Sequence, residues 1–266
     1  MKETRVLLFI PMYNCERQIG RVLAQLDERA RQVIDAVIVV DNRSPDGSQA
    51  AARKAMEGVR GVPVSLLENV GNYGLGGSHK VAFDYARANG FTHVIVLHGD
   101  DQGDIHDLVP LLQQGRHLGV DGLLGARFMR GARLQNYSRF RTFGNEVFNW
   151  IFSIAAGKRL YDLGSGLNLY SVAALSRIPY HRYANDLTFN YYMILGTVAA
   201  GWRIEFFPIS WREDDQISNV KLFKQARKTL GLVASFFFRR RWFLETDHSG
   251  KPDQQYQSTV VAESAP

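Results

Sequence analysis

The sequence has little cysteine and no long apolar run. Its one cysteine, Cys15, cannot form a disulfide within the chain, which excludes a disulfide-stapled scaffold and favours a reducing compartment. The apolar run near the start is too short for a signal peptide, and none elsewhere reaches the roughly 18 apolar residues of a transmembrane helix. These absences predict a cytoplasmic protein.

Two sequence patterns typical of nucleotide-binding enzymes are also missing. The glycine run at residues 71–80 does not read G-x-G-x-x-G, and no acidic residue ends a strand about 20 residues later in the way that this pattern requires, so the sequence argues against a dehydrogenase. The first expected strand is not followed by the glycine- and lysine-rich loop of a nucleotidyltransferase. A glycine run without either pattern is also typical of a flexible loop that leads into a helix.

Positive charge is in modest excess. The chain has 32 Lys and Arg against 26 Asp and Glu, a formal net charge of +6, which favours anionic partners. That excess alone does not show whether the anionic partner is a nucleotide, a lipid phosphate or a nucleic acid. Hydrophobic residues make up 45% of the chain, which excludes wholesale disorder.

The first half of the chain alternates strand and helix patterns. Continuous runs of Val, Ile and Leu alternate with amphipathic segments, which predicts an α/β fold with a mostly parallel sheet and helices on both faces. Ligands of such sheets bind at the carboxyl ends of the strands. The expected strands are 5–14, 35–42, 63–69 and 93–101, and the expected helices are 16–32, 48–58 and 78–90.

Polar side chains gather where these strands end. Tyr13, Asn14 and Glu16 follow the first strand, residues 41–46 follow the second, and residues 98–102 follow the fourth. Asn and Asp are also good turn formers and helix caps, so the first two clusters are equally consistent with simple connections. The third cluster is also consistent with a solvated acidic turn.

Beyond Gly125 the pattern changes to longer helical stretches rich in arginine. We expect one domain over residues 1–221, made of a first half (1–124) and a second half (125–221). An amphipathic helix over 222–245 and a polar, disordered tail over 246–266 are expected to follow.

Six motifs together resemble a known family. "IPMYNCERQI", "VVDNRSPDGS", "NVGNYGLGGSHKVAFDYA", "LHGDDQGD", "GARFMRG" and "DLGSGLNLY" occur in the order and approximate spacing of family 2 glycosyltransferases of the GT-A fold. Within that family the chain is most similar to the dolichyl- and polyprenyl-phosphate sugar synthases. The resemblance implies an enzyme, a hexosyltransferase that inverts the sugar as it moves it from a UDP- or GDP-linked donor to a polyprenyl phosphate. It implies no nucleic-acid partner.

The resemblance also implies which residues hold the donor nucleotide. Asp41 would bind the base and ribose, and Asn42 stands where the family usually has a second Asp. The other implied contacts lie in the three loops that follow the first strands. The implied nucleotide-binding residues are Pro11, Tyr13, Asn14, Glu16, Asp41, Ser44, Asp46, Asn72 and Gly76.

A divalent cation, Mg²⁺ or Mn²⁺, is implied at the fourth strand end. Aligned on the family's Asp-x-Asp pattern, Asp100 is the second acid, Gln102 is the following glutamine, and His98 replaces the first acid. A cation held there would neutralise the departing diphosphate. An imidazole ligand would shift preference from Mg²⁺ toward Mn²⁺. Asp101 could supply the lost charge, although neighbours on a strand point to opposite faces.

The second half carries the implied acceptor and phosphate site. Arginine suits this role because its guanidinium bonds two phosphate oxygens at once. Transfer to a hydroxyl would need a general base, for which Asp186 is the first candidate and Asp162 the second, although helix capping explains both as well. The implied catalytic residues are Asp100, Asp186 and Arg127, and the implied acceptor or phosphate contacts are Arg127, Arg139, Arg141, Ser165, Arg212 and Ser218.

The C-terminal segment raises the question of membrane contact. Leu230, Val233 and Phe237 fall near one helical face, and residues 239–241 are arginines followed by Trp242, as at a lipid headgroup boundary. We therefore expect a peripheral helix at the cytoplasmic face of a membrane. The alternative is a helix packed on the core.

Two other functions stay open. A family 2 enzyme could act on a hydroxyl of a saccharide or another soluble acceptor. A non-catalytic nucleotide-sugar binder is the second alternative, because His98 and Asn42 replace family acids.

Overall fold

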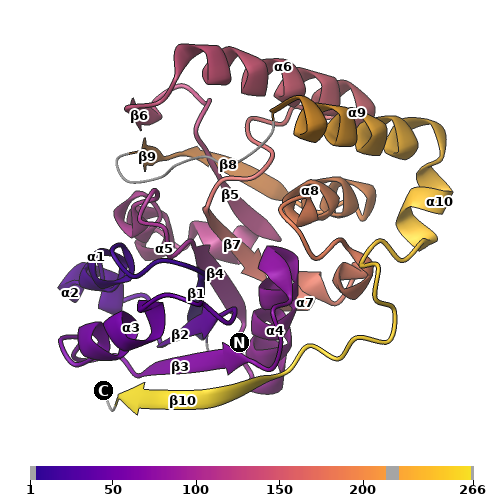
Figure 1. The fold of residues 1–266 in the computed structure, drawn as a ribbon. Coiled ribbons are helices and arrows are strands. Elements are labelled where there is room, and N and C mark those ends of the chain that lie inside the picture. The colour runs from indigo at the N-terminus through magenta and orange to yellow at the C-terminus, as the bar shows by residue number, and fades with distance from the viewer. Residues whose placement is uncertain (1–3, 214–221, 265–266) are drawn as a thin grey trace.

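The computed structural model describes residues 4–213 and 222–264, with only the backbone over 222–225. Ser218, an expected phosphate contact, lies outside these residues. A twisted sheet in the order β10-β3-β2-β1-β4-β7-β5-β8 runs through the centre of the molecule (Figure 1). Its strands are β1 Val6–Met12, β2 Ala36–Asp41, β3 Val64–Asn69, β4 His93–Leu97, β5 Gly122–Ala126, β7 Leu167–Ser171, β8 Ile204–Pro208 and β10 Ser258–Ser264.

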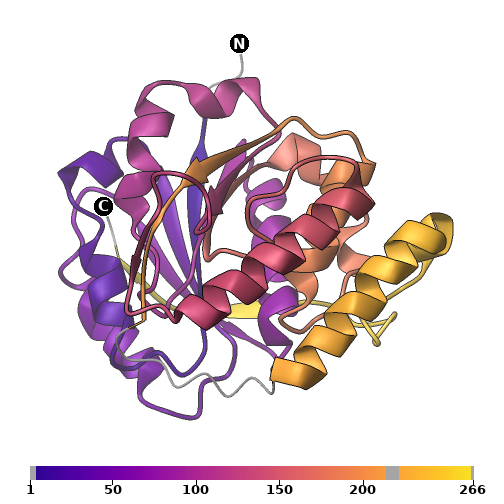
Figure 2. The same cartoon turned by 90° about the horizontal axis from the view of Figure 1, so that it is seen from above.

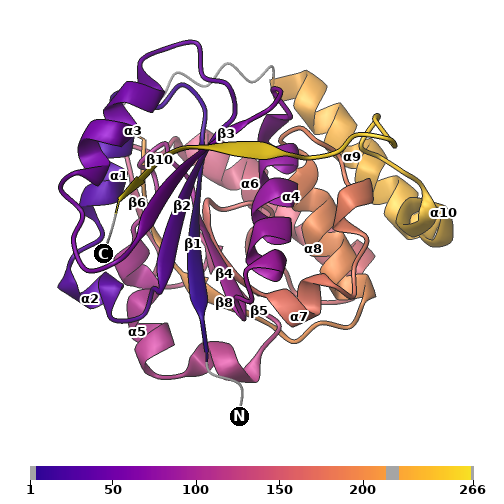
Figure 3. The same ribbon diagram turned by 90° about the horizontal axis from the view of Figure 1, so that it is seen from below.

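Helices cover both faces of the sheet. Figure 3 shows α1 and α3 on one side and α4 and α8 on the other. The helices are α1 Ile19–Ala24, α2 Glu28–Arg31, α3 Ser48–Met56, α4 Gly74–Ala88, α5 Val109–Gln113, α6 Arg139–Ala156, α7 Val172–Leu175, α8 Phe189–Ala199, α9 Leu222–Phe238 and α10 Arg240–Glu245. Three short 3₁₀ turns are η1 Ile105–Asp107, η2 Arg116–Gly119 and η3 Tyr180–Arg182. A small parallel pair, β6 Arg133–Gln135 and β9 Ser210–Arg212, lies beside the sheet.

Strand β1 explains why its sequence is apolar throughout. Leu7 and Phe9 belong to the core on the side of α4 and α8, and Leu8 and Ile10 to the core on the side of α1 and α3. A strand with both faces covered needs apolar side chains at every position. The predicted α/β fold with helices on both faces is confirmed.

The sheet is mixed rather than parallel throughout. β1 pairs in parallel with β2 and β4, but β7 runs antiparallel to β4 and β5, and β10 runs antiparallel to β3. The expected helix over 16–32 is two helices, because Asp27 caps α2 by accepting a hydrogen bond from the Ala30 amide at 3.0 Å. Helix α4 begins at Gly74, four residues before the expected start at residue 78.

The predicted disordered tail is wrong. Residues 246–257 cross the molecule as an extended arm, and β10 then adds a strand beside β3 (Figure 1). Val260 and Val261 are β-branched, and the exposed edge of β3 supplies the backbone partners that a polar segment would otherwise find in water. The expected single helix over 222–245 is also broken at Arg239, where φ is −133° and ψ is 43°.

Candidate active site

The parallel strands bring the predicted loops to one end of the sheet. Met12 pairs with Asp41 across β1 and β2, and Phe9 pairs with Val96 across β1 and β4. The loops that follow these strands therefore lie next to one another. The carbonyl of Pro11 accepts a hydrogen bond from the Gly99 amide at 3.1 Å, which joins the first loop to the fourth strand end.

Asp41 is held rigidly at the end of β2. Its carboxylate is 1% exposed and accepts hydrogen bonds from the amide (3.1 Å) and hydroxyl (2.6 Å) of Ser44. The Asn14 amide in turn donates to the Ser44 hydroxyl at 3.1 Å. Burial raises the pKa of Asp41 although the bonds from Ser44 oppose the shift. The loop thus presents an acid whose position is fixed before any ligand arrives.

Asp46 and Glu16 join the first two loops. Asp46 accepts hydrogen bonds from the amides of Ser48, at 3.1 Å, and Glu16, at 3.4 Å. Glu16 accepts from the Gly47 amide at 3.3 Å, so close that a Cβ at Gly47 would lie 2.6 Å from its carboxylate. These bonds join the two loops, as the turn interpretation expects, but no side chain caps the N-terminus of α1 or α3. The nucleotide contacts of the two acids stay predictions. Tyr13, beside them, is 47% exposed.

Asn42, which replaces a family acid, sits in a buried amide network. Its Oδ1 accepts from Asn69 Nδ2 (3.0 Å) and from the Tyr73 amide (2.8 Å). Its Nδ2 donates to Asn72 Oδ1 at 2.9 Å. An aspartate could accept the first two bonds but could not donate the third. The replacement therefore ties the end of β2 to the loop that carries Asn72.

The glycine run approaches the chain itself. A Cβ at Gly74 would lie 2.4 Å from the Asn185 carbonyl, and one at Gly76 would lie 2.3 Å from the Ala184 carbonyl. Gly74 also has φ +70°, which favours glycine. Gly76, an implied nucleotide contact, is instead packed against Ala184 and Phe189 of the chain itself.

The acidic cluster after β4 divides into two roles. Asp101, with φ +60°, turns its side chain toward Arg21 and Arg212. Arg21 Nε lies 2.6 Å from its carboxylate, and Arg212 Nε donates to its carbonyl at 2.7 Å. Asp101 is 3% exposed, so this is a buried acid neutralised by two arginines. It does not supply the charge that His98 lacks, and Arg212 is engaged here.

Asp100 is the other acid of this cluster. Its carboxylate accepts from the Gln102 amide at 3.3 Å, and burial raises its pKa to about 6. His98 directly follows β4, and burial lowers its pKa to about 4, which keeps the imidazole neutral. Its Nε2 is shielded from solvent and has no hydrogen-bond partner within the described residues.

These side chains fit a cation only in part. Within residues 4–213 and 222–264, no group of three or more His, Cys, Asp or Glu side chains could hold a metal ion. A hard cation needs only one or two protein carboxylates when substrate phosphates complete its shell, and Asp100 suits that arrangement. A neutral imidazole nitrogen without a partner is the form that ligates metals, but His98 Nε2 is closed off, so the ring must turn to reach a cation.

Arg127 is fixed by Asp162. Its Nε and Nη2 each lie 2.8 Å from the Asp162 carboxylate, and its guanidinium carbon lies 4.9 Å from the centre of the Trp211 ring. Asp162 also accepts from the Arg127 amide at 2.9 Å and from Gly164 at 3.1 Å. With these four bonds and 3% exposure, Asp162 does not fit the second-choice general base. Its role is to orient Arg127.

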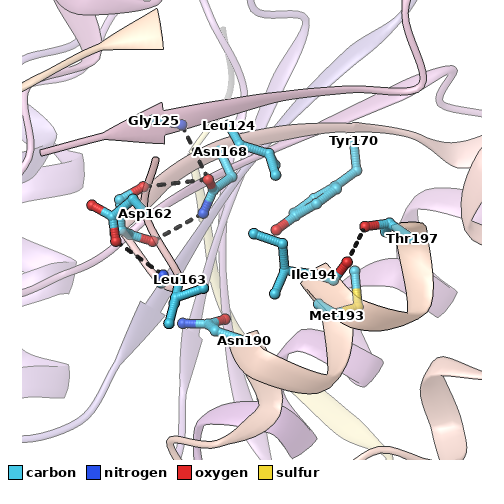
Figure 4. A pocket seen from close by; sticks show the side chains of 12 residues that line it. Leu124, Gly125, Asp162, Leu163, Asn168, Tyr170, Asn190, Met193, Ile194 and Thr197 are labelled. Atoms are coloured by element: carbon cyan, nitrogen blue, oxygen red, sulfur yellow. Dashed lines mark hydrogen bonds between the residues drawn. The ribbon is translucent and has the colours of Figure 1, made fainter. Parts of the chain in front are cut away.

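A small cavity between β5, β7 and α8 is lined in part by the loop that carries Asp162 (Figure 4). Asn168 on β7 accepts from the Gly125 amide at 3.2 Å and donates to the Ser165 carbonyl at 2.9 Å. The Ser165 hydroxyl donates to the Leu167 carbonyl at 3.1 Å and is buried. Ser165 therefore shapes the loop, and its predicted contact with phosphate is not evident in this geometry.

The arginines at the start of α6 differ in freedom. Arg139 is exposed. Arg141 lies 2.5 Å from Glu213 and stacks on Tyr137 with 4.7 Å between its guanidinium carbon and the ring centre. Only Arg139 of this pair is placed as an open cation at the surface.

Asp186, the first-choice base, is an ion-paired turn residue. Its carboxylate accepts from the Thr188 amide at 2.8 Å and from the Lys228 ammonium on α9. Burial works against ionisation, but the bonds from Lys228 and Thr188 outweigh it and hold the pKa of Asp186 below its usual value. A carboxylate with a lowered pKa is a poor proton acceptor.

One buried residue escaped the sequence interpretation. Lys80 on α4 is 0% exposed, and burial lowers its pKa to about 8. The sequence did indicate this burial, because helical spacing places residue 80 on the same inward face as Gly76, Gly77 and Phe83.

Comparison with known sequences identifies relatives. The profile of Glycosyl transferase family 2 matches residues 8–183. A dolichol-phosphate mannosyltransferase of Pyrococcus furiosus is 26% identical over 137 residues, which make up 52% of this chain and 37% of that protein. The match thus spans little more than a third of that relative's length.

Two solved structures share the fold. Glucosyl-3-phosphoglycerate synthase from Mycobacterium tuberculosis, in complex with Mn²⁺, UDP and phosphoglyceric acid, is 15% identical with a TM-score of 0.63, covering 97% of this chain and 86% of that one. A mannosyltransferase from Pyrobaculum calidifontis, in complex with GDP-Man and Mn²⁺, is 18% identical with a TM-score of 0.59, covering 90% and 65%. With the family profile spanning most of the strands and loops described above, the chain belongs to glycosyl transferase family 2.

Proposed function

We propose that the chain transfers a sugar, with inversion, from a UDP- or GDP-linked donor to a polyprenyl phosphate at a membrane surface, with a divalent cation. The observation that carries the acceptor is an apolar stripe on the outer side of α6. The structural relatives bound to UDP or GDP-Man with Mn²⁺ support the donor and the cation. The dolichol-phosphate mannosyltransferase relative supports the acceptor class.

The stripe follows the helical period along α6. Residues 140, 143, 147, 150 and 154 recur every three or four positions and so share one face. The opposite face packs into the core through Phe152, which is fully buried. An apolar face turned to solvent on a helix whose other side is already packed marks a contact surface. The exposed fractions are Phe140 77%, Phe143 66%, Val147 38%, Trp150 66% and Ile154 53%.

Helix α9 extends this surface. It lies alongside α6 at one side of the molecule (Figures 1 and 2). Leu232, Val233 and Phe236 pack into the core, whereas Leu230 and Phe237 are exposed, so the expected single apolar face is divided between core and surface. Exposed arginines at 239–241 and Trp242 follow. Apolar side chains edged by cations suit an anionic bilayer.

The described helices do not cross a membrane by themselves. None in residues 4–213 and 222–264 is long and apolar enough to span one. The proposed contact is therefore one in which α6 and α9 lie along the lipid surface.

The donor would occupy the ends of β1, β2 and β4. In the proposal Asp41 binds the nucleoside, and the Ser44 and Asn14 bonds hold its carboxylate ready. Asp100 holds the cation, with Gln102 and a turned His98 as further ligands. The cation supplies positive charge to the departing diphosphate.

In the proposal Arg127 binds phosphate from the side opposite the cation. Asp162 takes its Nε and Nη2, and within the described residues its Nη1 has no hydrogen bond. The carboxylate and the Trp211 ring fix the guanidinium plane, so the remaining N–H groups need no reordering when phosphate arrives.

The state of Asp186 favours a phosphate acceptor over a hydroxyl. A hydroxyl must lose its proton to a base, while a phosphate oxygen is already anionic. The ion pair with Lys228 keeps Asp186 ionised and weakly basic. We infer that Asp186 orders the start of α8 and anchors α9.

The test is transfer itself. The protein is incubated with Mn²⁺, radiolabelled UDP- and GDP-sugars, and either a polyprenyl phosphate in detergent or 3-phosphoglycerate in buffer. The proposal predicts label in the organic extract with the lipid only. Label in the aqueous product with 3-phosphoglycerate alone would overturn the lipid acceptor and leave the donor chemistry standing.

A soluble phosphorylated acceptor is the second candidate. It is favoured by the fold relative bound to phosphoglyceric acid, which matches 97% of this chain. That candidate gives no role to the stripe on α6.

A further inference from the structure

The C-terminal arm, residues 246–257, crosses the molecule between the 183–187 loop and the loop after β3 that carries Asn72. It leaves α10, passes the loop at residues 183–187, and reaches β3 (Figures 1 and 3). The His248 amide donates to the Arg182 carbonyl at 2.7 Å at one end, and β10 pairs with β3 at the other. The arm is therefore fastened at both ends.

The arm contacts both loops directly. On the acceptor side, Asn185 Nδ2 donates to the Ser249 carbonyl at 3.2 Å. On the donor side, the Val70 amide donates to the Gln257 carbonyl at 3.0 Å. Residue 70 begins the loop that carries Asn72, and residue 185 precedes Asp186. One segment thus holds a loop from each half of the molecule.

Lys80 on α4 donates hydrogen bonds to both the 183–187 loop and the arm. Its ammonium donates to the Tyr183 carbonyl (2.6 Å), to Asn185 Oδ1 (2.6 Å) and to the Tyr256 hydroxyl (3.1 Å), and lies 4.6 Å from the centre of the Tyr256 ring. All three acceptors are neutral oxygens. A buried ammonium without a bonded carboxylate depends on every acceptor it has.

Tyr256 completes this set from the arm. Its hydroxyl donates to Asn185 Oδ1 at 2.8 Å while accepting from Lys80. Its ring meets Tyr73 edge-on at 5.4 Å. The Tyr73 amide in turn donates a hydrogen bond to Asn42 Oδ1, which fixes the position of Tyr73. Removing this hydroxyl leaves Lys80 and Asn185 each short of a partner.

We propose that Tyr256 is a positioning residue for the donor site, acting through Lys80 and Asn185 to hold the 183–187 loop against the 70–73 loop. The inference rests on the donor site proposed above and not on the identity of the acceptor. It assigns the arm a part in nucleotide binding rather than only in closing the sheet edge.

The experiment compares Tyr256→Phe with the parent and with Gln255→Ala. Gln255 is an exposed residue of the same arm whose side chain bonds to Gln257. Calorimetry measures the affinity for UDP and for GDP in the presence of Mn²⁺. Amide hydrogen exchange is followed at Val70, Tyr73 and Gly76, whose amides bond to Gln257, Asn42 and Asn185.

Tyr256→Phe should weaken the nucleotide that the parent binds by about three- to tenfold, the effect of one hydrogen bond. It should also speed exchange at the three amides, while Gln255→Ala matches the parent. A lower melting temperature with unchanged affinity would overturn the proposal, since that is a purely structural effect. Binding of neither nucleotide by the parent would overturn the donor site and this inference together, whereas failure of the lipid acceptor would leave the measured affinity intact.

A second variant tests the route of action. Lys80→Met should weaken binding at least as much, and adding Tyr256→Phe should weaken it no further, because both changes remove the same interaction. Independent, additive losses would contradict the route through Lys80. If Lys80→Met does not fold, the conservative Tyr256→Phe carries the test alone.

Discussion

The two halves of the molecule treat polar and apolar side chains in opposite ways. In residues 4–124, polar groups at the strand ends bond to one another, and apolar side chains are mostly inside. In residues 125–213 and 222–264, apolar side chains also line the outside. Within the described residues, the exposed phenylalanines and tryptophans all lie in this second part: Phe140, Phe143, Trp150, Phe237, Phe238 and Trp242.

This difference separates two kinds of recognition. A preformed polar network suits a small, charged ligand, because its donors and acceptors are in place before binding. A broad apolar surface suits a partner that offers area and no fixed geometry, as a bilayer does. Changing residues in one half at a time tests whether each half carries out only one of these two kinds of recognition.

The largest effect is expected at Asp100. Asp100→Asn should reduce kcat by about 10³-fold or more, because the charge that faces the cation is lost and cation stabilisation is worth several kcal/mol. Burial already disfavours the ionised form of Asp100, so the variant should melt at or above the parent's temperature. Kinetics at saturating donor and a melting curve measure the two. Turnover equal to that of the parent would contradict the cation site.

The neighbouring acid is the matched control. Asp101→Asn removes one partner from the contacts with Arg21 and Arg212 and should cost about 1–3 kcal/mol of folding free energy. Because the Asp101 carboxylate is occupied by Arg21 and Arg212, nucleotide affinity should change little. Urea unfolding and calorimetry test this reversal of effects between adjacent residues. A loss of affinity without a loss of stability would show that the two roles are exchanged.

Asp186 tests the second half. Asp186→Asn should lower the transfer rate less than about tenfold, while loss of a general base costs about 10²- to 10⁴-fold. The ion pair with Lys228 is exposed, so the change in stability should also be small. Single-turnover transfer measures the chemical step. A loss of hundredfold or more, with unchanged nucleotide affinity, would favour a hydroxyl acceptor.

The smallest effect concerns pH. The raised pKa of Asp100, about 6, means that its protonated form favours folding at low pH and that this contribution is lost as pH rises through 6. A cation competes with the proton for this carboxylate, so cation binding stabilises the fold fully above pH 6 and progressively less below it. Saturating Mn²⁺ and nucleotide should therefore raise the melting temperature on the order of 5 °C at pH 7.5 and less at pH 5. Asp100→Asn should remove this difference, and an equal shift at both pH values would contradict it.

The sequence predicted the first half better than the second for a physical reason. Buried strands and amphipathic helices leave periodic patterns, so Asp41 and Asp100 could be placed at strand ends. The sequence did not show that Asp101 turns toward Arg21 and Arg212, because the partners lie 80 and 111 residues away. It also missed β10, since pairing with β3 depends on an edge that the local composition of the tail does not reveal.

The second half was harder because periodicity gives a face but not its direction. The stripe on α6 reads equally as a core face, and α9 has apolar residues on both its core and solvent sides. Which side meets the core depends on how α6 and α9 pack against the rest of the fold. The Lys228 contact with Asp186 depends on the same packing.

Sedimentation with phosphatidylglycerol vesicles tests the central claim most directly. The parent should sediment at low salt and partly dissociate at moderate salt. Phe143→Ser with Trp150→Ser should abolish binding, and changing Arg239, Arg240 and Arg241 to Gln should weaken it by roughly a hundredfold, at about 1 kcal/mol for each cation. The control changes Arg29, Arg53 and Lys54 to Gln, which removes the same charge from exposed positions on α2 and α3. A parent that stays in solution at low salt, or variants of α6 and α9 that sediment like the control, would contradict the account.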